Sequence, residues 1–222
     1  MLKVVVLTVT SELSINDFDI LLSLVDSCKK KRLKQFHFFQ DARNCLLGDV
    51  LSRLLICSNT GLSNKQLQFF SDAYGKPFLT NNPFMHFNIS HAGHYIACAV
   101  SDKPVGIDIE LIRTVDMAIV ERFFTPDEKA YVISDELERC FCEIWTKKES
   151  RTKFDGVGLH KPLPSFDVLE NKEHLIYHKI FESIDAIGHV CTTINTLPTV
   201  IMTDSISFLR YVNCPETRAL LW

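Results

Sequence analysis

The hydrophobic and polar positions of the first hundred residues follow two different periods. Runs rich in β-branched residues predict strands, and apolar residues spaced three and four apart predict helices. The predicted strands are residues 3–9, 85–90 and 94–101, the last two joined as a hairpin at the sequence HAGH. The predicted helices are residues 15–32, which end in basic residues, and 41–58, with Asp41 as the cap. A turn is predicted at Gly75-Lys76-Pro77.

The second half begins with a clear strand and a clear helix start. Thr125 has the position of an N-cap, Pro126 follows at the first helical position, and Glu128 stands three residues after the cap, as in a capping box. The other predicted elements are a strand over 105–112, a helix over 136–153, and short strands separated by turns over 165–212.

The order of the predicted elements repeats once along the chain. Strand, helices and strands are followed by strand, helices and strands. This order predicts an α+β fold of two similar halves, residues 1–103 and 104–222, packed with a ligand cleft between them. The two halves share no repeated sequence, so the duplication is inferred from element order alone.

Composition and charge exclude several classes of function. The 222 residues are 46% hydrophobic and 23% charged, and the formal net charge of -3 gives no overall attraction to nucleic acid or membrane. The eight cysteines form no C-x-x-C pair, which argues against a zinc ribbon and for a reducing, cytoplasmic environment. The apolar start MLKVVVLTVT lacks a basic leader and is too short to span a bilayer, so it predicts a strand and not a signal peptide.

The sequence PVGIDIELIR places two carboxylates in an apolar strand. Because strand side chains alternate between faces, Asp108 and Glu110 share one face while Ile107 and Ile109 share the other. Acidic residues are poor strand formers, and two on one face repel each other. Either this face is a solvent-exposed side of a half-buried sheet, or the carboxylates hold a divalent cation.

A third carboxylate and a nearby lysine extend the candidate cation site. Mg²⁺ prefers hard oxygen ligands, and Glu149 in the helical sequence WTKKES would add a third carboxylate to Asp108 and Glu110. Lys153 lies one helical turn after Glu149, which fits either a surface ion pair or a lysine that stabilises a departing phosphate. Basic residues that could bind other phosphates are far away in sequence: Lys29, Lys30, Lys31, Arg32, Arg43 and Lys76. The run from Lys29 to Arg32 also fits a solvated helix end.

Several of these segments together resemble one enzyme family. The sequences FNISHAGHYIACAVSDKPVGIDIELI, RFFTPDEKAYV and WTKKESRTKFDGVGL are similar to those of 4'-phosphopantetheinyl transferases, of the larger monomeric type that serves peptide and polyketide synthetases. The combination of G-I-D-I-E with W-x-x-K-E-S at this separation is specific, although neither motif alone would be. The resemblance runs from DARNCLLGDVL through YGKP to PLPSFDV and weakens in the last third of the chain.

The resemblance implies a transfer reaction that uses coenzyme A as co-substrate. It implies that Asp108, Glu110 and Glu149 hold Mg²⁺ on the coenzyme A pyrophosphate, and that Lys153 assists there. Glu149 would also activate the acceptor serine, directly or through water. The nucleotide and its 3'-phosphate would be contacted by Lys29, Arg32, Lys76, Ser90 and His91. The acceptor would be an apo carrier protein of fatty-acid, polyketide or peptide synthesis.

One position departs from the family pattern. The family often has an arginine directly before a small hydroxyl residue, whereas this chain has Asn44 and Cys45 there, with Arg43 one residue earlier. A one-residue offset on a helix turns the side chain by about 100°. Arg43 is therefore a candidate coenzyme A contact whose direction differs from that of the family arginine.

Two other functions and one docking surface stay open at this point. A different magnesium-dependent phosphoryl or nucleotidyl transferase would use the same three acids, but the sequence has no glycine-rich phosphate loop. A non-catalytic module that binds coenzyme A or a carrier would not need the acids. Phe123 and Phe124 are either core residues or a docking patch for the carrier.

Overall fold

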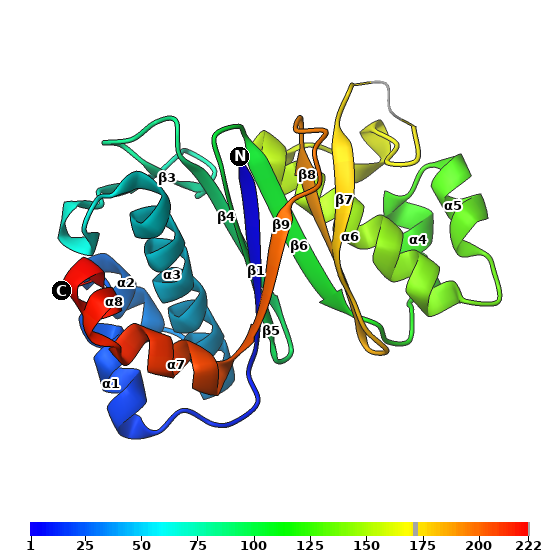
Figure 1. Cartoon of the computed structure of the whole chain (residues 1–222). Coiled ribbons are helices and arrows are strands. Elements are labelled where there is room, and N and C mark those ends of the chain that lie inside the picture. Colours follow the sequence, from blue (N-terminus) through cyan, green and yellow to red (C-terminus); the bar gives the residue numbers. More distant parts are fainter. Residues whose placement is uncertain (171–172, 222) are drawn as a thin grey trace.

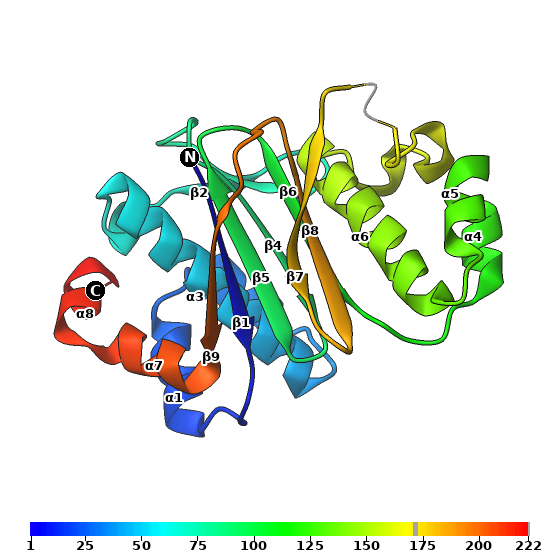
Figure 2. The same ribbon diagram turned by 45° about the vertical axis from the view of Figure 1, so that its right-hand side comes forward.

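The computed structural model describes residues 1–170 and 173–221 and shows a layered α+β fold. Two sheets pack face to face, and one long helix covers the outer face of each, α3 (Phe39–Thr60) on one side and α6 (Leu137–Asp155) on the other (Figures 1 and 2). The first sheet has the order β4-β5-β1-β9, with bounds His86–Ala92, Tyr95–Ser101, Leu2–Thr8 and Thr199–Asp204. The second has the order β6-β8-β7, with bounds Val105–Leu111, Ala186–Thr192 and Ile176–Glu182.

The two halves of the chain build the same unit. In the first half, β1 is followed by α3 and the antiparallel hairpin β4–β5, and β5 pairs antiparallel with β1. In the second half, β6 is followed by α6 and the antiparallel hairpin β7–β8, and β8 pairs antiparallel with β6. The strand orders β4-β5-β1 and β7-β8-β6 therefore correspond, which confirms the predicted α+β fold of two similar halves.

The end of the chain returns to the first half. Strand β9 pairs in parallel with β1, and the helices α7 (Ser205–Asn213) and α8 (Pro215–Leu221) pack against β1 and α3 respectively. The predicted strand over 205–212 is wrong, because the Asp204 side chain accepts hydrogen bonds from the amides of Ile206 and Ser207 and so starts a helix. The division into 1–103 and 104–222 stays a prediction, although the last residues pack with the first half.

The middle of the molecule is an apolar layer between the two sheets. Ile107 and Ile109 of β6 are fully buried there, as are Val4 and Val6 of β1. The alternate residues of β6 face α6, so the carboxylates of Asp108 and Glu110 lie on the helix-covered face of the strand. The predicted alternation of acids and isoleucines in this strand is therefore confirmed.

Two predicted helices differ from the structure, one by a break in its middle and one at its N-terminal end. Residues 15–32 form two helices, α1 (Ile15–Ser23) and α2 (Ser27–Leu33), because Asp26 accepts a hydrogen bond from the Lys29 amide and starts the second one. Helix α3 begins before Asp41 with Phe38 at the N-cap, so Asp41 lies in the first turn and is not the cap. An aspartate in the first turn still complements the positive end of the helix dipole.

The remaining elements complete the outer layers. They are η1 (Asn64–Gln66), β2 (Phe69–Ser71), β3 (Pro77–Leu79), α4 (Met117–Phe123), α5 (Pro126–Val132), η2 (Gly158–His160) and η3 (Leu163–Ser165). The predicted turn at Gly75 joins β2 to β3, and Gly75 has a φ of 86°, which favours glycine. The predicted capping box of Thr125 and Glu128 is present at the start of α5.

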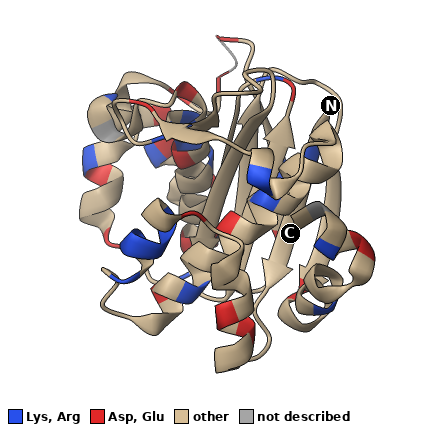
Figure 3. Ribbon diagram, turned by 90° about the vertical axis from the view of Figure 1, so that its left-hand side faces the viewer, with Lys and Arg blue, Asp and Glu red and all other residues tan. Residues whose placement is uncertain are grey.

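Charges of both signs are interspersed on the side of the molecule that carries the helices of the first half (Figure 3). Ribbon segments that carry Lys or Arg lie next to segments that carry Asp or Glu over these helices. This distribution fits the small net charge of -3. Of the helices in residues 1–170 and 173–221, none combines the length and the apolar character that crossing a bilayer requires.

Candidate active site

The candidate active site lies where β4 of the first half runs beside β6 of the second half, under α6. The glycine of the GIDIE motif allows this arrangement. A Cβ atom on Gly106 would lie 2.0 Å from the Ser150 carbonyl oxygen and 2.3 Å from the Phe154 amide nitrogen, both backbone atoms of α6. Helix α6 therefore rests directly on the backbone of β6, and the side chains that follow Gly106 on this face lie against the helix.

Asp108 is the centre of the site. Its side chain is almost completely buried, and its Oδ1 atom accepts hydrogen bonds from Ser90 Oγ at 2.8 Å and Lys153 Nζ at 2.6 Å. Lys153 Nζ also donates to Ser90 Oγ at 2.9 Å. The second oxygen, Oδ2, is buried and has no hydrogen-bond partner. A buried carboxylate oxygen without a partner is costly, so this atom lacks an interaction that a ligand could supply.

Burial and the Asp108 carboxylate raise the pKa of the other two predicted acids, Glu110 and Glu149. Burial and then the Asp108 carboxylate raise the pKa of Glu110 to about 7. The same two causes, in the same order, raise the pKa of Glu149, while Lys153 opposes the shift. The three acids and Lys153 therefore lie close enough to interact electrostatically, and Arg113, 3.9 Å from Glu110, adds a second positive charge there.

Asn88 is a site neighbour that the sequence reasoning missed. Its Oδ1 atom accepts a hydrogen bond at 2.9 Å from the backbone amide of Ile107, so a side chain of β4 satisfies an amide on the edge of β6. Asn88 and Ser90 are alternate residues of one strand and face the same way, and this spacing was the signal available in the sequence. These two side chains join the halves where their sheets meet.

A cavity of about 230 Å³ lies between the two halves next to Lys153. The first half contributes Asn88 and the turn between β2 and β3, and the second half contributes the end of α6 and η2. The lining residues are Tyr74, Gly75, Lys76, Pro77, Asn88, Thr152, Lys153, Gly156 and Gly158. A cavity is therefore present between the halves, and Lys153, which binds Asp108, is the residue that joins it to the three acids.

Three of the predicted nucleotide contacts lie on the first half outside this cavity. His91 follows Ser90 on β4 and is exposed. Arg32 is exposed on α2. Lys29, also on α2, forms an ion pair with Asp49 at 2.7 Å. Their contact with a nucleotide stays a prediction.

Arg43 and Lys76 have contacts within the protein. The Arg43 side chain is buried and donates through Nε and Nη2 to Asn44 Oδ1, and Asn44 in turn donates to the Gly93 carbonyl in the β4–β5 turn. Lys76 Nζ donates to backbone carbonyls of β6 and α6, and burial lowers its pKa. Any contact of these two residues with coenzyme A stays a prediction.

Comparison with known proteins matches two consecutive parts of the chain to two family models. Residues 12–103 match the model of the 4'-phosphopantetheinyl transferase N-terminal domain, and residues 104–194 match that of the 4'-phosphopantetheinyl transferase superfamily. The chain belongs to the 4'-phosphopantetheinyl transferase family. The resemblance found in the GIDIE and WTKKES segments is thereby confirmed.

Curated relatives of the chain come from bacteria and fungi. The chain is 39% identical over 159 residues to 4'-phosphopantetheinyl transferase ffp of Bacillus subtilis, which covers 70% of this chain and 71% of that protein. It is 34% identical over 182 residues to 4'-phosphopantetheinyl transferase gsp of Aneurinibacillus migulanus. This match covers 81% of this chain and 76% of that protein. It is 32% identical over 167 residues to L-aminoadipate-semialdehyde dehydrogenase-phosphopantetheinyl transferase of Saccharomyces cerevisiae. This match covers 68% of this chain and 60% of that protein.

The lysine of the transferase motif W-x-x-K-E-S faces away from the acids. Lys148 is fully buried, and its Nζ lies 2.8 Å from Glu128, which is also fully buried. Lys148 Nζ donates further to the carbonyls of Leu163 and Phe166, and Glu128 accepts from the amides of Thr125 and Val168. The predicted capping role of Glu128 is correct but incomplete, because this buried pair also ties α5, α6 and the segment after η3 together.

Removing either partner of this pair should destabilise the transferase strongly. We expect Lys148→Met to lower the free energy of unfolding by about 3–5 kcal/mol, because it leaves the Glu128 carboxylate buried without its counter-charge. Chemical denaturation would measure this. The double variant Lys148→Met/Glu128→Gln should lose less than the sum of the two single variants. A fully additive double variant, or a Lys148→Met protein as stable as the parent, would contradict the coupling.

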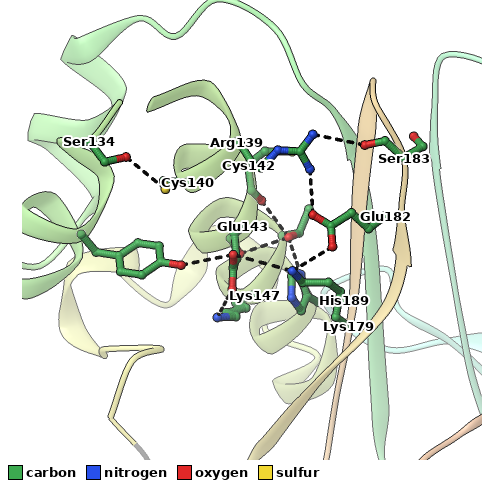
Figure 4. A network of polar contacts seen from close by, with 12 residues as sticks. Ser134, Arg139, Cys140, Cys142, Glu143, Lys147, Lys179, Glu182, Ser183 and His189 are labelled. Atoms are coloured by element: carbon green, nitrogen blue, oxygen red, sulfur yellow. Dashed lines mark hydrogen bonds and ion pairs between the residues drawn. The ribbon is translucent and has the colours of Figure 1, made fainter. Parts of the chain in front are cut away.

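A second polar network fixes the N-terminal part of α6 on β7 and β8 (Figure 4). His189 of β8 lies 2.8 Å from the Thr146 hydroxyl through Nδ1, and burial lowers its pKa to about 3, so the ring is neutral. Glu143 pairs with Lys179 of β7 at 4.0 Å, and Arg139 donates to Glu182 at 2.7 Å. The helix that carries Glu149 and Lys153 is thus held at its start by contacts to the sheet.

The two phenylalanines that follow Arg122 differ in burial. Phe124 is buried in the apolar cluster under α4 and α5, and its ring stacks on Phe141 with centroids 5.5 Å apart. Phe123 is half-buried and contacts Trp145 edge-on. Phe124 therefore belongs to the core and Phe123 packs against it, which favours the core interpretation. A carrier contact by the exposed part of Phe123 stays a prediction.

Proposed function

We propose that this chain transfers the 4'-phosphopantetheine arm of coenzyme A to a serine of an apo carrier protein. The observation that carries the proposal is the buried Asp108 carboxylate, with one oxygen bound by Ser90 and Lys153 and the other oxygen unpartnered. This carboxylate lies at the junction of two halves that each match a transferase model. The names of the relatives support this reaction class.

The residues at the junction suit a magnesium ion in their donor chemistry. Asp108, Glu110 and Glu149 offer the carboxylate oxygens that Mg²⁺ prefers, and the unpartnered Asp108 Oδ2 is a free donor. Within residues 1–170 and 173–221, no three His, Cys, Asp or Glu side chains already converge as a metal site. We therefore expect the acids to hold the ion jointly with oxygens of the substrate pyrophosphate, as is common for Mg²⁺.

The side chains of the site have separate tasks in the transfer. The carrier serine oxygen attacks the β-phosphorus of coenzyme A, and the bond to the leaving 3',5'-adenosine bisphosphate breaks. Glu149 removes the serine proton, directly or through water, and its raised pKa suits a general base. Lys153 places positive charge beside the pyrophosphate. The bound metal ion would neutralise charge on the pyrophosphate oxygens.

The nucleotide end of coenzyme A would lie along the first half. The cavity between the halves adjoins Lys153, and Ser90 and His91 lead from it along β4. Lys29 and Arg32 on α2 would contact the 3'-phosphate. We further propose that the enzyme acts as a monomer in the cytoplasm and that its carriers belong to fatty-acid, polyketide or peptide synthesis.

Intact-mass analysis of carrier proteins would test the reaction and its metal dependence. Apo acyl carrier and peptidyl carrier proteins are incubated with the enzyme, coenzyme A and Mg²⁺, beside a sample that contains a chelator. We expect the carrier to gain the mass of one phosphopantetheine arm with Mg²⁺ and to gain nothing with the chelator, because the clustered carboxylates cannot bind the pyrophosphate without a cation.

The other outcomes of this experiment each contradict one part of the proposal. Modification of the carrier that persists in the chelator would remove the metal from the mechanism. Tight binding of coenzyme A without modification of any carrier type would favour a non-catalytic binding module. Transfer of a different phosphoryl or nucleotidyl group, visible as a different mass, would replace the assigned reaction.

A further inference from the structure

Lys76 reaches from the β2–β3 turn of the first half into the second half. Its Nζ atom donates to the carbonyl of Phe154 at 3.1 Å, to the carbonyl of Lys153, and to the carbonyl of Val105 at 3.4 Å. Two of these acceptors belong to the last turn of α6 and the third to the start of β6. A lysine ammonium has three donors, and here each has a backbone acceptor.

The end of α6 is a place that requires such a donor. The last carbonyls of a helix have no partners within the helix, and the helix dipole makes this end negative. Gly156 closes α6 in the left-handed conformation and bonds back to Thr152, which leaves the carbonyls of Lys153 and Phe154 to be satisfied from outside. The ammonium of the half-buried Lys76 side chain satisfies both.

The conformation of the β2–β3 turn directs the Lys76 side chain toward the C-terminal end of α6. The Asp72 side chain accepts hydrogen bonds from the amides of Tyr74 and Lys76, each at 2.9 Å, which fixes the turn. The stem of Lys76 then passes Gly156, where an added Cβ would lie 3.2 Å from Lys76 Cδ. Tyr74 adds a ring contact to His160 of η2, with centroids 5.0 Å apart.

We propose that Lys76 is a positioning residue that clamps the last turn of α6 onto the start of β6, and that its ammonium is not a phosphate ligand of coenzyme A. The clamp acts on the turn that carries Lys153 and follows Glu149, so it sets these side chains against Asp108 on β6. This inference rests on the proposed transferase function for its kinetic consequences. Its structural content, the clamp, can be tested without that function.

Kinetics with two co-substrates separate a clamp from a phosphate ligand. Lys76→Met keeps the length of the stem and removes the ammonium. We expect kcat to fall about 10- to 100-fold, because Lys153 and Glu149 lose their fixed places, while KM for coenzyme A changes less than about twofold. The loss should be the same with dephospho-coenzyme A, which lacks the 3'-phosphate. Lys76→Arg, which restores a cationic donor, should recover part of kcat, and Lys65→Met at an exposed position is the matched control.

Hydrogen exchange of the unliganded protein tests the clamp itself. We expect Lys76→Met to speed amide exchange in the peptides that cover the end of α6, while peptides of α3 exchange as in the parent protein. This measurement needs no transferase activity, so it tests the clamp even if the proposed function fails. It also needs only a folded variant, and Lys76→Arg replaces Lys76→Met if the latter does not fold, with a smaller effect at the same peptides.

Two results would overturn the proposal. The first is unchanged exchange at the end of α6 in both variants. The second is an unchanged kcat with a KM that rises many-fold for coenzyme A but not for dephospho-coenzyme A, which would make Lys76 a ligand of the 3'-phosphate.

Discussion

Replacement of Asp108 by Asn is expected to lower kcat by about 100- to 1,000-fold, the range found when one electrostatic contact to a transition state is removed. The substitution keeps the shape of the side chain and removes its charge. Ser90 and Lys153 both donate to Oδ1, so the amide oxygen is expected at that place and the amide nitrogen at the place of the unpartnered Oδ2. An amide nitrogen cannot bind a cation, so a metal ion on the pyrophosphate would lose a ligand. Intact-mass assays of carrier modification over time would measure the loss.

The same substitution should leave the fold intact. Two effects of opposite sign act on the free energy of unfolding. The ion pair with Lys153 is weakened, but the repulsion between Asp108 and the carboxylates of Glu110 and Glu149 disappears. We expect the net change to stay within about 1 kcal/mol, the usual range when such effects nearly cancel. Thermal or chemical denaturation of the variant would show whether a loss of activity reflects the site or the fold.

Asp135→Asn is the matched control for Asp108→Asn. Asp135 is exposed in the loop before α6, so the same chemical change there should alter neither turnover nor stability measurably. An Asp108→Asn enzyme with full turnover would remove Asp108 from the catalytic site. Equal losses in the two variants would point to an effect of net charge and would contradict a local role.

Much of this site could be predicted because its signals are local. The alternation of Asp108 and Glu110 with isoleucines sets their common face, and the Thr125 capping box sets the start of α5. Both patterns depend on residues within a few positions of each other, where backbone geometry alone relates side chains. The structure therefore agrees with the sequence at these points.

The contacts between the halves could not be predicted in the same way. The hydrogen bond between Asn88 and the Ile107 amide joins residues 19 positions apart. The hydrogen bond between Lys76 and the Lys153 carbonyl at the end of α6 joins residues 77 positions apart. Nothing in the local pattern around Lys76 distinguishes a helix cap from a phosphate ligand, because an ammonium serves both. The pairing of β9 with β1 likewise depends on the tertiary fold and not on the local sequence.

The prediction of one helix over residues 15–32 is wrong because a side chain inside it starts a second helix. The helical pattern of residues 15–32 continues through Asp26, but the Asp26 carboxylate bonds to the Lys29 amide and starts a new helix. Asp26 also binds Arg53 at 2.7 Å, which fixes it in that place. The apolar spacing alone would allow one continuous helix. The helix nevertheless breaks at Asp26, because this N-cap residue is also held by an ion pair with a distant residue.

Gly106→Ala is expected to have the largest effect on stability among small substitutions in the transferase. The added Cβ would lie 2.0 Å from the Ser150 carbonyl oxygen and 2.3 Å from the Phe154 amide nitrogen. These are backbone atoms of a helix that is fixed at both ends, so they cannot move aside as a flexible side chain can. We expect the free energy of unfolding to fall by about 3 kcal/mol or more, the upper part of the range for overpacking.

The loss of activity should exceed what the loss of stability explains. Helix α6 must move away from β6 to accept the methyl group, and it carries Glu149 and Lys153 away from Asp108. A displacement of about 1 Å is enough to lower a rate 100-fold. Turnover measured at a temperature where the variant is still folded, as shown by circular dichroism, would separate displacement of the site from unfolding.

Gly188→Ala is a matched control on the neighbouring strand β8. Its Cβ would meet the flexible end of Ile180 at 3.0 Å and the Asp108 carbonyl at 3.3 Å, so small adjustments suffice. We expect a cost of about 1 kcal/mol and little change in turnover. If Gly106→Ala cost no more than Gly188→Ala, α6 would not rest on the β6 backbone, and the glycine of GIDIE would need a different explanation.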